Sequence, residues 1–216
     1  MSTVLYLETN FIVGAAFGQD ERADILLRIP TAELQIALPS VCIMEVWAVF
    51  EAEKKQRNTL KDTLNDQIAK LSRYPNSPHA LALIKHLQLA LTENADLLND
   101  VEVRLRDVLS KISGLQAGSP AVELLPLTQT AFQGSLPAGP TKDHTDNLIL
   151  AVILAHAQEH PSLNKVLLSN NSKDFQTPEV KALLLAAGVT LTFAHTKAFL
   201  DWFHADNQTK LGNEST

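Results

Sequence analysis

The sequence predicts an α/β fold, in which an open parallel sheet is covered by helices and a long helical pair is inserted. Short apolar runs alternate with helical segments at both ends of the chain, and two long helical segments lie between them. The run Val4–Leu7 is apolar throughout, as is typical of a parallel strand covered on both faces. We expect one domain over residues 1–205, with a helical elaboration over about 50–113 and a polar, frayed tail over 206–216.

Helix and strand signals alternate in the first half of the chain. Pro39 and Ser40 mark the start of a long helix, with Ser40 as the expected N-cap, and the prolines of "RYPNSPHA" end it. The expected elements are a strand at Val4–Leu7, helices at Phe11–Phe17 and Asp20–Ile29, a strand at Leu34–Leu38, and a helix from Ser40 to about Leu71.

The second half begins with another long helix, over about Pro78–Ile112, whose leucines form an apolar stripe. "SGLQAGSP" ends this helix, and a Gly- and Pro-rich loop, "QGSLPAGPTKD", follows later. The remaining expected elements are strands at Val122–Leu125, Lys165–Ser169 and Val189–Phe193, and helices at Thr128–Phe132, Asp143–His156, Pro178–Ala187 and Thr196–Trp202.

Composition narrows the class of protein. The single cysteine, Cys42, cannot form an internal disulfide, which favours a reducing, cytoplasmic setting. No signal-like or membrane-spanning apolar run is present, so we expect no membrane association. The net charge of −6 counts against a nucleic-acid partner but does not exclude one, because a local basic strip can bind phosphates. No G-x-G-x-x-G or Walker-type lysine loop is present, which counts against those nucleotide-binding folds.

Polar residues follow two of the expected strands. Glu8 ends the first strand, and Asn170, Asn171 and Asp174 follow the strand that ends "VLLSN". Ligands of open parallel sheets bind beyond the carboxyl ends of the strands, so these side chains should share one edge of the sheet. The alternative for "SNNSKDF" is a plain turn, since Asn, Ser and Asp favour turns for local reasons.

Three further acids stand out by their surroundings. Glu45 is the only charge in the apolar start of a helix, "ALPSVCIMEVWAVF", so it has a cation partner or lies on a narrow exposed stripe. Asp143 and Asp146 flank the start of "NLILAVILAHA". Asp143 is best interpreted as an N-cap, whereas Asp146, in the first turn of an apolar helix, could face inward.

Taken in order, these pieces resemble a PIN-domain protein. The matching stretches are "YLETNF", "LPSVCIMEVWAVF", "DNLILAVILAHA" and "LLSNNSKDF", and they span almost the whole chain in the family's order. The last one looks like the family's T-x-N-x-x-D-F segment. The resemblance implies a three-layer α/β/α sandwich around a parallel sheet, here with a long helical hairpin, and the activity of a metal-dependent ribonuclease, as in the VapC-like toxins of toxin–antitoxin pairs.

Carried over by position, the resemblance implies an acidic quartet that holds Mg²⁺ or Mn²⁺ and catalyses RNA hydrolysis. Its members are Glu8, Glu45, Asp146 and Asp174, with Asn10 and Asn171 in supporting roles. Asp143 has no firm counterpart in the family and is a candidate extra supporting residue. Such ions prefer hard oxygen ligands and can activate a water for attack on a phosphate. Gathering several acids also predicts that at least one carboxyl has a raised pKa in the metal-free protein.

The chain departs from the family pattern in two ways. The family usually has aspartate where Glu8 stands, so a second hypothesis is a PIN-like protein without nuclease activity that binds RNA or a protein. The long helical stretch is the other departure: its basic residues could contact RNA or form a solvated face, and the insertion could form a homodimer interface or occupy an antitoxin's place. These basic residues are Lys54, Lys55, Arg57 and Lys61.

Overall fold

A five-stranded parallel sheet forms the centre of the protein. The computed structural model describes residues 3–29, 34–114, 122–134, 140–141 and 143–213. All strands run in the same direction, in the order β3-β2-β1-β4-β5. The strands are β1 (Thr3–Leu7), β2 (Leu34–Pro39), β3 (Val122–Leu125), β4 (Asn164–Leu168) and β5 (Val189–Phe193).

The central strand, β1, explains the apolar run near the start of the sequence. It pairs with β2 on one side (Leu5 opposite Ile36) and with β4 on the other (Leu5 opposite Val166), and every one of its residues is buried. The connection out of β1 leads to β2, whereas β4 enters on the opposite side of β1. The order in which the chain adds strands to the sheet therefore reverses between β1 and β4, and this switch point is where open α/β sheets bind their ligands.

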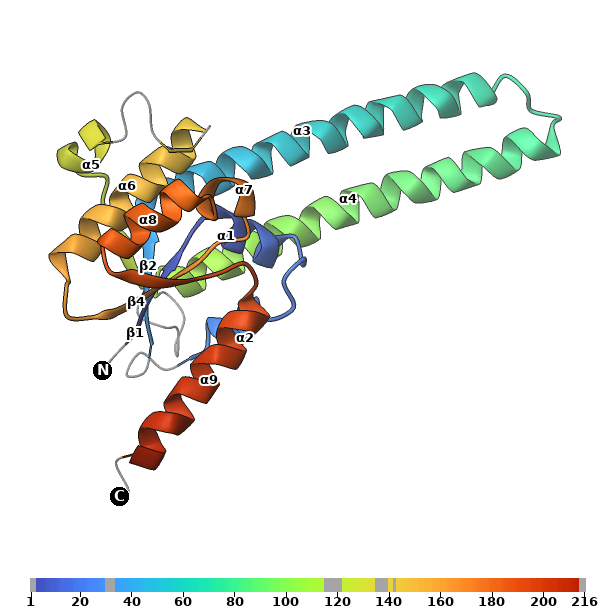
Figure 1. Cartoon of the computed structure of the whole chain (residues 1–216). Helices are drawn as coiled ribbons and strands as arrows, with labels where there is room; N and C mark the ends of the chain where they lie inside the picture. Colours follow the sequence, from blue (N-terminus) through green and yellow to red (C-terminus); the bar gives the residue numbers. More distant parts are fainter. Residues whose placement is uncertain (1–2, 30–33, 115–121, 135–139, 142, 214–216) are drawn as a thin grey trace.

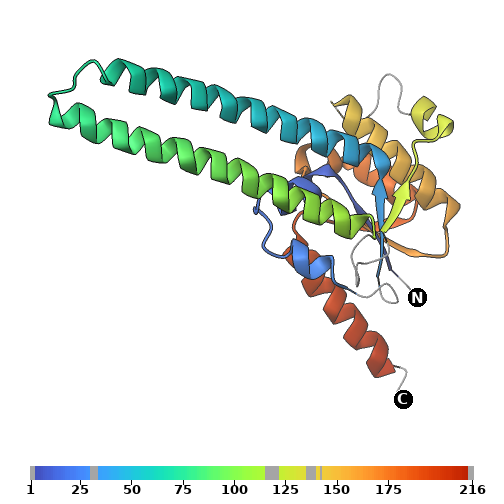
Figure 2. The ribbon, with the colours of Figure 1, turned by 180° about the vertical axis from the view of Figure 1, so that it is seen from behind.

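Helices cover both faces of the sheet and give a three-layer α/β/α sandwich, as predicted (Figures 1 and 2). One outer layer holds α1, α2, α9 and the last turns of α4; the other holds α5, α6 and α8. Their bounds are α1 (Thr9–Ala16), α2 (Ala23–Leu26), α4 (Pro78–Ile112), α5 (Gln129–Gly134), α6 (His144–Glu159), α8 (Pro178–Ala186) and α9 (Thr196–Asn213).

The two longest helices form a hairpin that projects far beyond the sheet (Figure 1). Helix α3 (Ser40–Leu71) leaves the sheet edge and α4 returns to it. Ser77 caps α4, accepting a hydrogen bond from the Ala80 N–H, and Pro78 occupies the first turn, where its missing N–H costs nothing. The predicted boundaries of α4 and the predicted break before it are confirmed.

Two arginines fix the hairpin in place. Midway along it, the Arg57 guanidinium donates to the Asn94 side chain at 3.3 Å, and the Asn94 amide donates to the Arg57 carbonyl at 3.1 Å. Nearer the sheet, Arg104 Nε donates to the Ala16 carbonyl at 2.9 Å, which satisfies a free carbonyl at the end of α1. The base of the hairpin is thus part of the domain's core, whereas its outer half is largely exposed.

Several sequence-based boundaries were wrong. The segment 20–29 is mostly turns around the short α2, because the Asp20 side chain accepts from the Arg22 N–H and starts a turn. Pro39, not Ser40, occupies the N-cap position of α3. Helix α9 continues past Trp202 to Asn213, into the segment expected to be a frayed tail. Much of the expected loop 133–143 and of "SGLQAGSP" lies outside the described residues.

No described helix combines the length and the apolar character needed to span a membrane.

Candidate active site

Glu8 lies where β1 ends and is the N-cap residue of α1. Its side chain is buried, and its two carboxylate oxygens accept hydrogen bonds from the backbone N–H groups of Asn10 (2.8 Å) and Asn170 (3.3 Å). Burial raises the pKa of Glu8 to about 7, with the Asp146 carboxylate adding to the rise and the backbone donors opposing it. The first strand ends in an acid because this acid caps the next helix and ties the loop after β4 to β1.

Glu45 lies in the second turn of α3, close to the start of α1. The buried Thr9 hydroxyl donates a hydrogen bond to its carboxylate. Cys42, one turn earlier, is fully buried, and burial, together with the neighbouring Glu8 and Glu45 carboxylates, raises the pKa of its thiol to about 12. Cys42 is therefore a neutral thiol that both acids approach, and it is not a nucleophile at neutral pH.

Asp146 lies in the first turn of α6 and faces inward, with a relative exposure of 9%. Asn171 Nδ2 donates to its Oδ2 at 3.0 Å. Burial raises the pKa of Asp146 to about 6; the carboxylates of Asp174, Glu45 and Asp143 raise it further, and the Asn171 hydrogen bond opposes them. Asp146 is thus repelled electrostatically by all three of these neighbouring carboxylates.

Of the other predicted site residues, Asp174 and Asp143 interact with Asp146, whereas Asn10 lies beside Glu8. Asp174 is half-buried in a single helical turn, α7 (Ser172–Phe175), that the sequence suggested as a plain turn. Asp143 is exposed and caps α6, accepting from the Thr145 N–H at 2.7 Å, as its N-cap interpretation predicted. Asn10 contributes its backbone N–H to Glu8, while its side chain is exposed.

Sequence reasoning missed two buried polar residues beside these acids. The Asn147 side chain is buried and pairs with both the N–H (3.0 Å) and the carbonyl (3.1 Å) of Thr141, which fixes the chain as it enters α6. Ser169 is also buried, and its hydroxyl accepts from the Asn171 N–H at 3.1 Å. A polar residue within an apolar stretch, which marked Glu45 as a candidate site residue, also marks Asn147 and Ser169.

The structure therefore brings Glu8, Glu45 and Asp174 within electrostatic reach of Asp146, at one edge of the sheet. The predicted rise in pKa is confirmed for Glu8 and Asp146. Over the described part of the chain, however, no three His, Cys, Asp or Glu side chains are arranged to hold a metal ion. The acids are neighbours, but they do not converge on one point in the metal-free chain.

The model of one protein family, the PIN domain, matches residues 5–175, which is most of the chain. The chain belongs to the PIN-domain family. A comparison with curated proteins gives no match. PIN domains are generally nucleases, so the family indicates an enzyme of the hydrolase kind that acts on phosphodiester bonds.

The region that matches the PIN-domain family contains both the candidate acids and the long helical hairpin. It begins within β1, ends at the last residue of α7, and includes all four candidate acids and the whole hairpin. Helices α8 and α9 and strand β5 follow the matched region.

The donor set of this PIN domain fits a hard divalent cation. All four candidate ligands are carboxylates, and Mg²⁺ and Mn²⁺ prefer oxygen ligands. Asp146 is held among like charges that raise its pKa, and a cation would relieve this repulsion.

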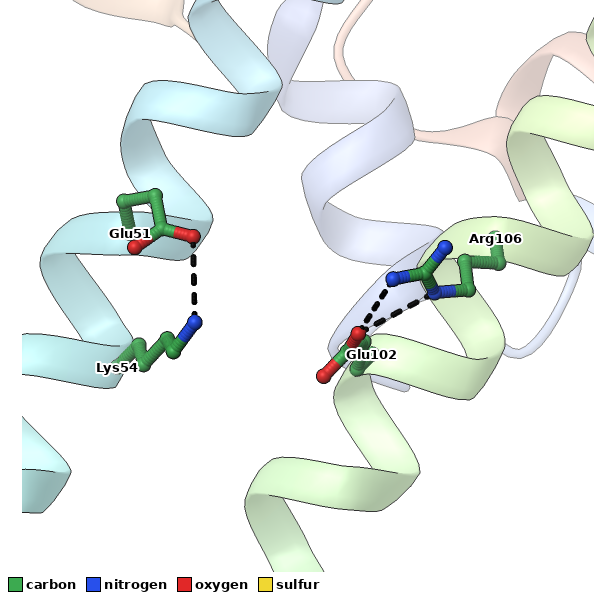
Figure 3. A network of polar contacts seen from close by, with 4 residues as sticks. All are labelled: Glu51, Lys54, Glu102 and Arg106. Atoms are coloured by element: carbon green, nitrogen blue, oxygen red, sulfur yellow. Dashed lines mark hydrogen bonds and ion pairs between the residues drawn. The ribbon is translucent and has the colours of Figure 1, made fainter.

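The basic residues of the hairpin are partly engaged in ion pairs along α3. Lys54 Nζ lies 3.5 Å from a Glu51 oxygen (Figure 3), and Arg57 Nε lies 2.6 Å from a Glu53 oxygen. On α4, Arg106 is paired in the same way with Glu102 (Figure 3). Lys55 and Lys61 are exposed. Contact of this group with RNA stays a prediction. The paired glutamates partly offset the positive charge of Lys54 and Arg57.

Proposed function

We propose that this PIN-domain protein is a Mg²⁺- or Mn²⁺-dependent endoribonuclease that hydrolyses RNA phosphodiester bonds at the carboxyl edge of the sheet. The observation that supports this most is the environment of Asp146, a buried carboxylate whose pKa is raised by Asp174 and Glu45 as well as by burial. A buried carboxylate beside like charges is costly unless a counter-ion binds it, so its presence at a topological switch point favours an ion-dependent site.

In this proposal, Glu8, Glu45, Asp146 and Asp174 hold the metal. When bound, the ion would lower the pKa of a water and neutralise charge on the phosphate and the leaving oxygen.

Neighbouring groups orient the carboxylates of Glu8, Glu45 and Asp146. Asn171 donates to one oxygen of Asp146 and leaves the other oxygen without a bond to it. The Thr9 hydroxyl holds Glu45, and two backbone N–H groups hold Glu8. A carboxylate has about four lone-pair positions, so each of these acids retains acceptor capacity after its protein hydrogen bonds are made. Donors that fix a carboxylate also reduce the ordering it must undergo when a ligand binds.

Cleavage of a fluorescently labelled RNA tests the proposal. We expect cleavage with Mg²⁺ or Mn²⁺, none with EDTA, and a loss of at least about 100-fold in Asp146→Asn and in Glu45→Gln, because each removes a ligand charge. Asp66→Asn is the matched control, since Asp66 is an exposed acid on the outer half of α3. Metal-dependent cleavage that is undiminished in both site variants would refute the assignment of these acids.

A second candidate function is a PIN-domain protein that binds RNA or a protein without cleaving RNA. Glu8 supports it, because both of its oxygens already accept backbone hydrogen bonds and the family usually has aspartate at this position. Calorimetry with Mn²⁺ discriminates between the two: absence of binding at millimolar concentrations favours the binding function. Higher activity in Glu8→Asp than in the wild type would show that the glutamate weakens a metal site.

A toxin-like role in the cytoplasm, with an antitoxin or a second copy bound to the hairpin, extends the leading proposal. Exposed apolar side chains on α4, including Leu81, Leu89 and Leu97, support such a partner surface. Growth arrest on expression, relieved by Asp146→Asn, would support the toxin role. Light scattering that gives a monomer mass at all concentrations would exclude the homodimer.

A further inference from the structure

A cavity of about 400 Å³ lies beside the candidate active site, between α1, the turn after it, and the start of α9. We call it the α1–α9 cavity. Its volume is in the range of roughly 300–1,000 Å³ that is typical of ligand pockets. It is lined by residues 10–11, 14, 18–22, 168, 170 and 194–197.

Two residues join the cavity to the acidic site. Asn10 and Asn170 both line the cavity, and their backbone N–H groups are the two that bind the Glu8 carboxylate. The cavity and the acids therefore share a wall.

A buried hydrogen bond fixes the far wall. The Thr196 hydroxyl is buried and donates to one oxygen of Asp20, whose other oxygen accepts from the Arg22 N–H at 2.9 Å. This arrangement joins the turn after α1 to the first residue of α9. Gly18 has a φ of +69°, which lets the chain make this turn. The wall is thus built into the fold.

The lining offers the groups that recognise a nucleotide. Side-chain amides of Asn10, Gln19 and Asn170 combine donors and acceptors, as the edges of nucleobases require, and the His195 ring provides a face for stacking. Arg22 and Lys197 bring positive charge, although Lys197 also pairs with Asp201 at 2.5 Å. Because acids and amides accompany the cations, this chemistry suits a base with its phosphate better than a free anion.

We propose that the α1–α9 cavity binds one nucleotide of a single-stranded RNA substrate, next to the phosphate that is cleaved. This rests on the proposed ribonuclease function. It assigns to residues 194–197, which follow β5 and begin α9 beyond the family match, the role of completing the substrate site. It also provides a substrate-binding surface in which amide, imidazole and cationic groups accompany the carboxylates, although the chain as a whole is acidic.

The test compares two double variants that make the same chemical changes at different places. Arg22→Ala with His195→Ala removes exposed groups from the cavity, and Arg73→Ala with His79→Ala removes exposed groups at the hairpin tip. We expect the cavity variant to raise KM for RNA by about tenfold or more with little change in kcat, and to alter which nucleotides flank the cleavage sites. The tip variant should resemble the wild type.

A cavity-filling variant gives a second measurement that does not depend on charge. A β-carbon added at Gly14 would lie 3.7 Å from the Asp20 β-carbon, an ordinary contact, so Gly14→Ala should be tolerated. Gly14→Leu places a larger side chain in the cavity and should reproduce the rise in KM. Unchanged KM and cleavage pattern in both the double variant and Gly14→Leu would overturn the proposal while leaving the ribonuclease function intact.

If the wild type cleaves no RNA, binding of nucleoside monophosphates still decides the question. We expect AMP, GMP, CMP or UMP at millimolar concentration to shift the amide NMR signals of Asn10 and Asn170, and these shifts should be absent in Gly14→Leu. Absence of any shift in the wild type would overturn the proposal. A cavity that accepts a protein segment would give this same negative result.

Discussion

Replacing Asp146 by asparagine should stabilise the metal-free protein while it abolishes activity. The pKa of Asp146 rises from 3.8 to about 6 on folding, mainly through burial and the Asp174, Glu45 and Asp143 carboxylates. At roughly 1.4 kcal/mol per pKa unit, the charged form costs about 3 kcal/mol of folding free energy at neutral pH. Asparagine has the same shape, carries no charge and keeps an oxygen to accept the Asn171 hydrogen bond.

The sign of this effect depends on pH. Since the folded-state pKa is raised, the stabilising contribution of Asp146 is fully present below pH 3.8 and is lost as the pH rises through about 6. We therefore expect Asp146→Asn to raise the free energy of unfolding by about 1–3 kcal/mol at pH 7.5, and by less than half of that at pH 4.5.

Urea unfolding in EDTA, followed by circular dichroism at the two pH values, measures the difference. Asp66→Asn is the matched control, because it makes the same chemical change at an exposed acid on the outer half of α3, away from Asp146. Its free energy of unfolding should stay within about 0.5 kcal/mol of that of the wild type. A gain in Asp146→Asn that is equal at both pH values, or no gain at all, would refute the electrostatic reasoning.

Three further predictions concern buried polar groups away from the acids. Asn94→Ala should cost about 1–3 kcal/mol, because the cross-hairpin hydrogen bonds are lost, and should speed amide exchange in the middle of α3 in hydrogen-exchange mass spectrometry. Lys165→Met should lower the melting temperature, because it removes the buried ammonium that donates to two helix-end carbonyls. Gly188→Ala should also lower it, because φ is +84° at Gly188 and a β-carbon there would lie 2.9 Å from Lys165 Nζ. Burial lowers the pKa of His156, with Glu123 opposing, so NMR should show the ring titrating below its usual pKa of about 6.5. The contribution of His156 to stability should fall as the pH drops below that value, opposite in sign to that of Asp146.

The sheet was predictable from the sequence because its signals are local. Apolar runs such as Val4–Leu7 have few alternatives to a doubly covered strand, and proline and serine mark the start of α4. The tail could not be predicted in the same way: α9 continues through a polar segment with no apolar periodicity. Lys165 also gave no signal, because a lysine in a fully buried strand position becomes favourable only when two helix ends bring carbonyls to it.

The candidate site was predictable in its location and less so in its detail. Strand ends of a parallel sheet share one edge, so the meeting of the Glu8 and Asp174 segments follows from topology alone. The hydrogen bonds between Thr9 and Glu45, and between Asn171 and Asp146, depend on how α3 and α6 pack, which no local pattern encodes.

Glu8 joins two segments of the sheet edge by hydrogen bonds and is also a candidate metal ligand. Its two oxygens reach N–H groups on opposite sides, one in the helix that follows β1 and one in the loop that follows β4. An aspartate, shorter by roughly 1–1.5 Å, would have to give up part of this span unless the backbone moved. The glutamate therefore holds the switch point of the sheet together, which accounts for a departure from the family's usual residue without requiring loss of activity. Because the same two N–H donors belong to residues that line the α1–α9 cavity, any shift of Glu8 toward a metal would also move the wall against which we place the neighbouring nucleotide.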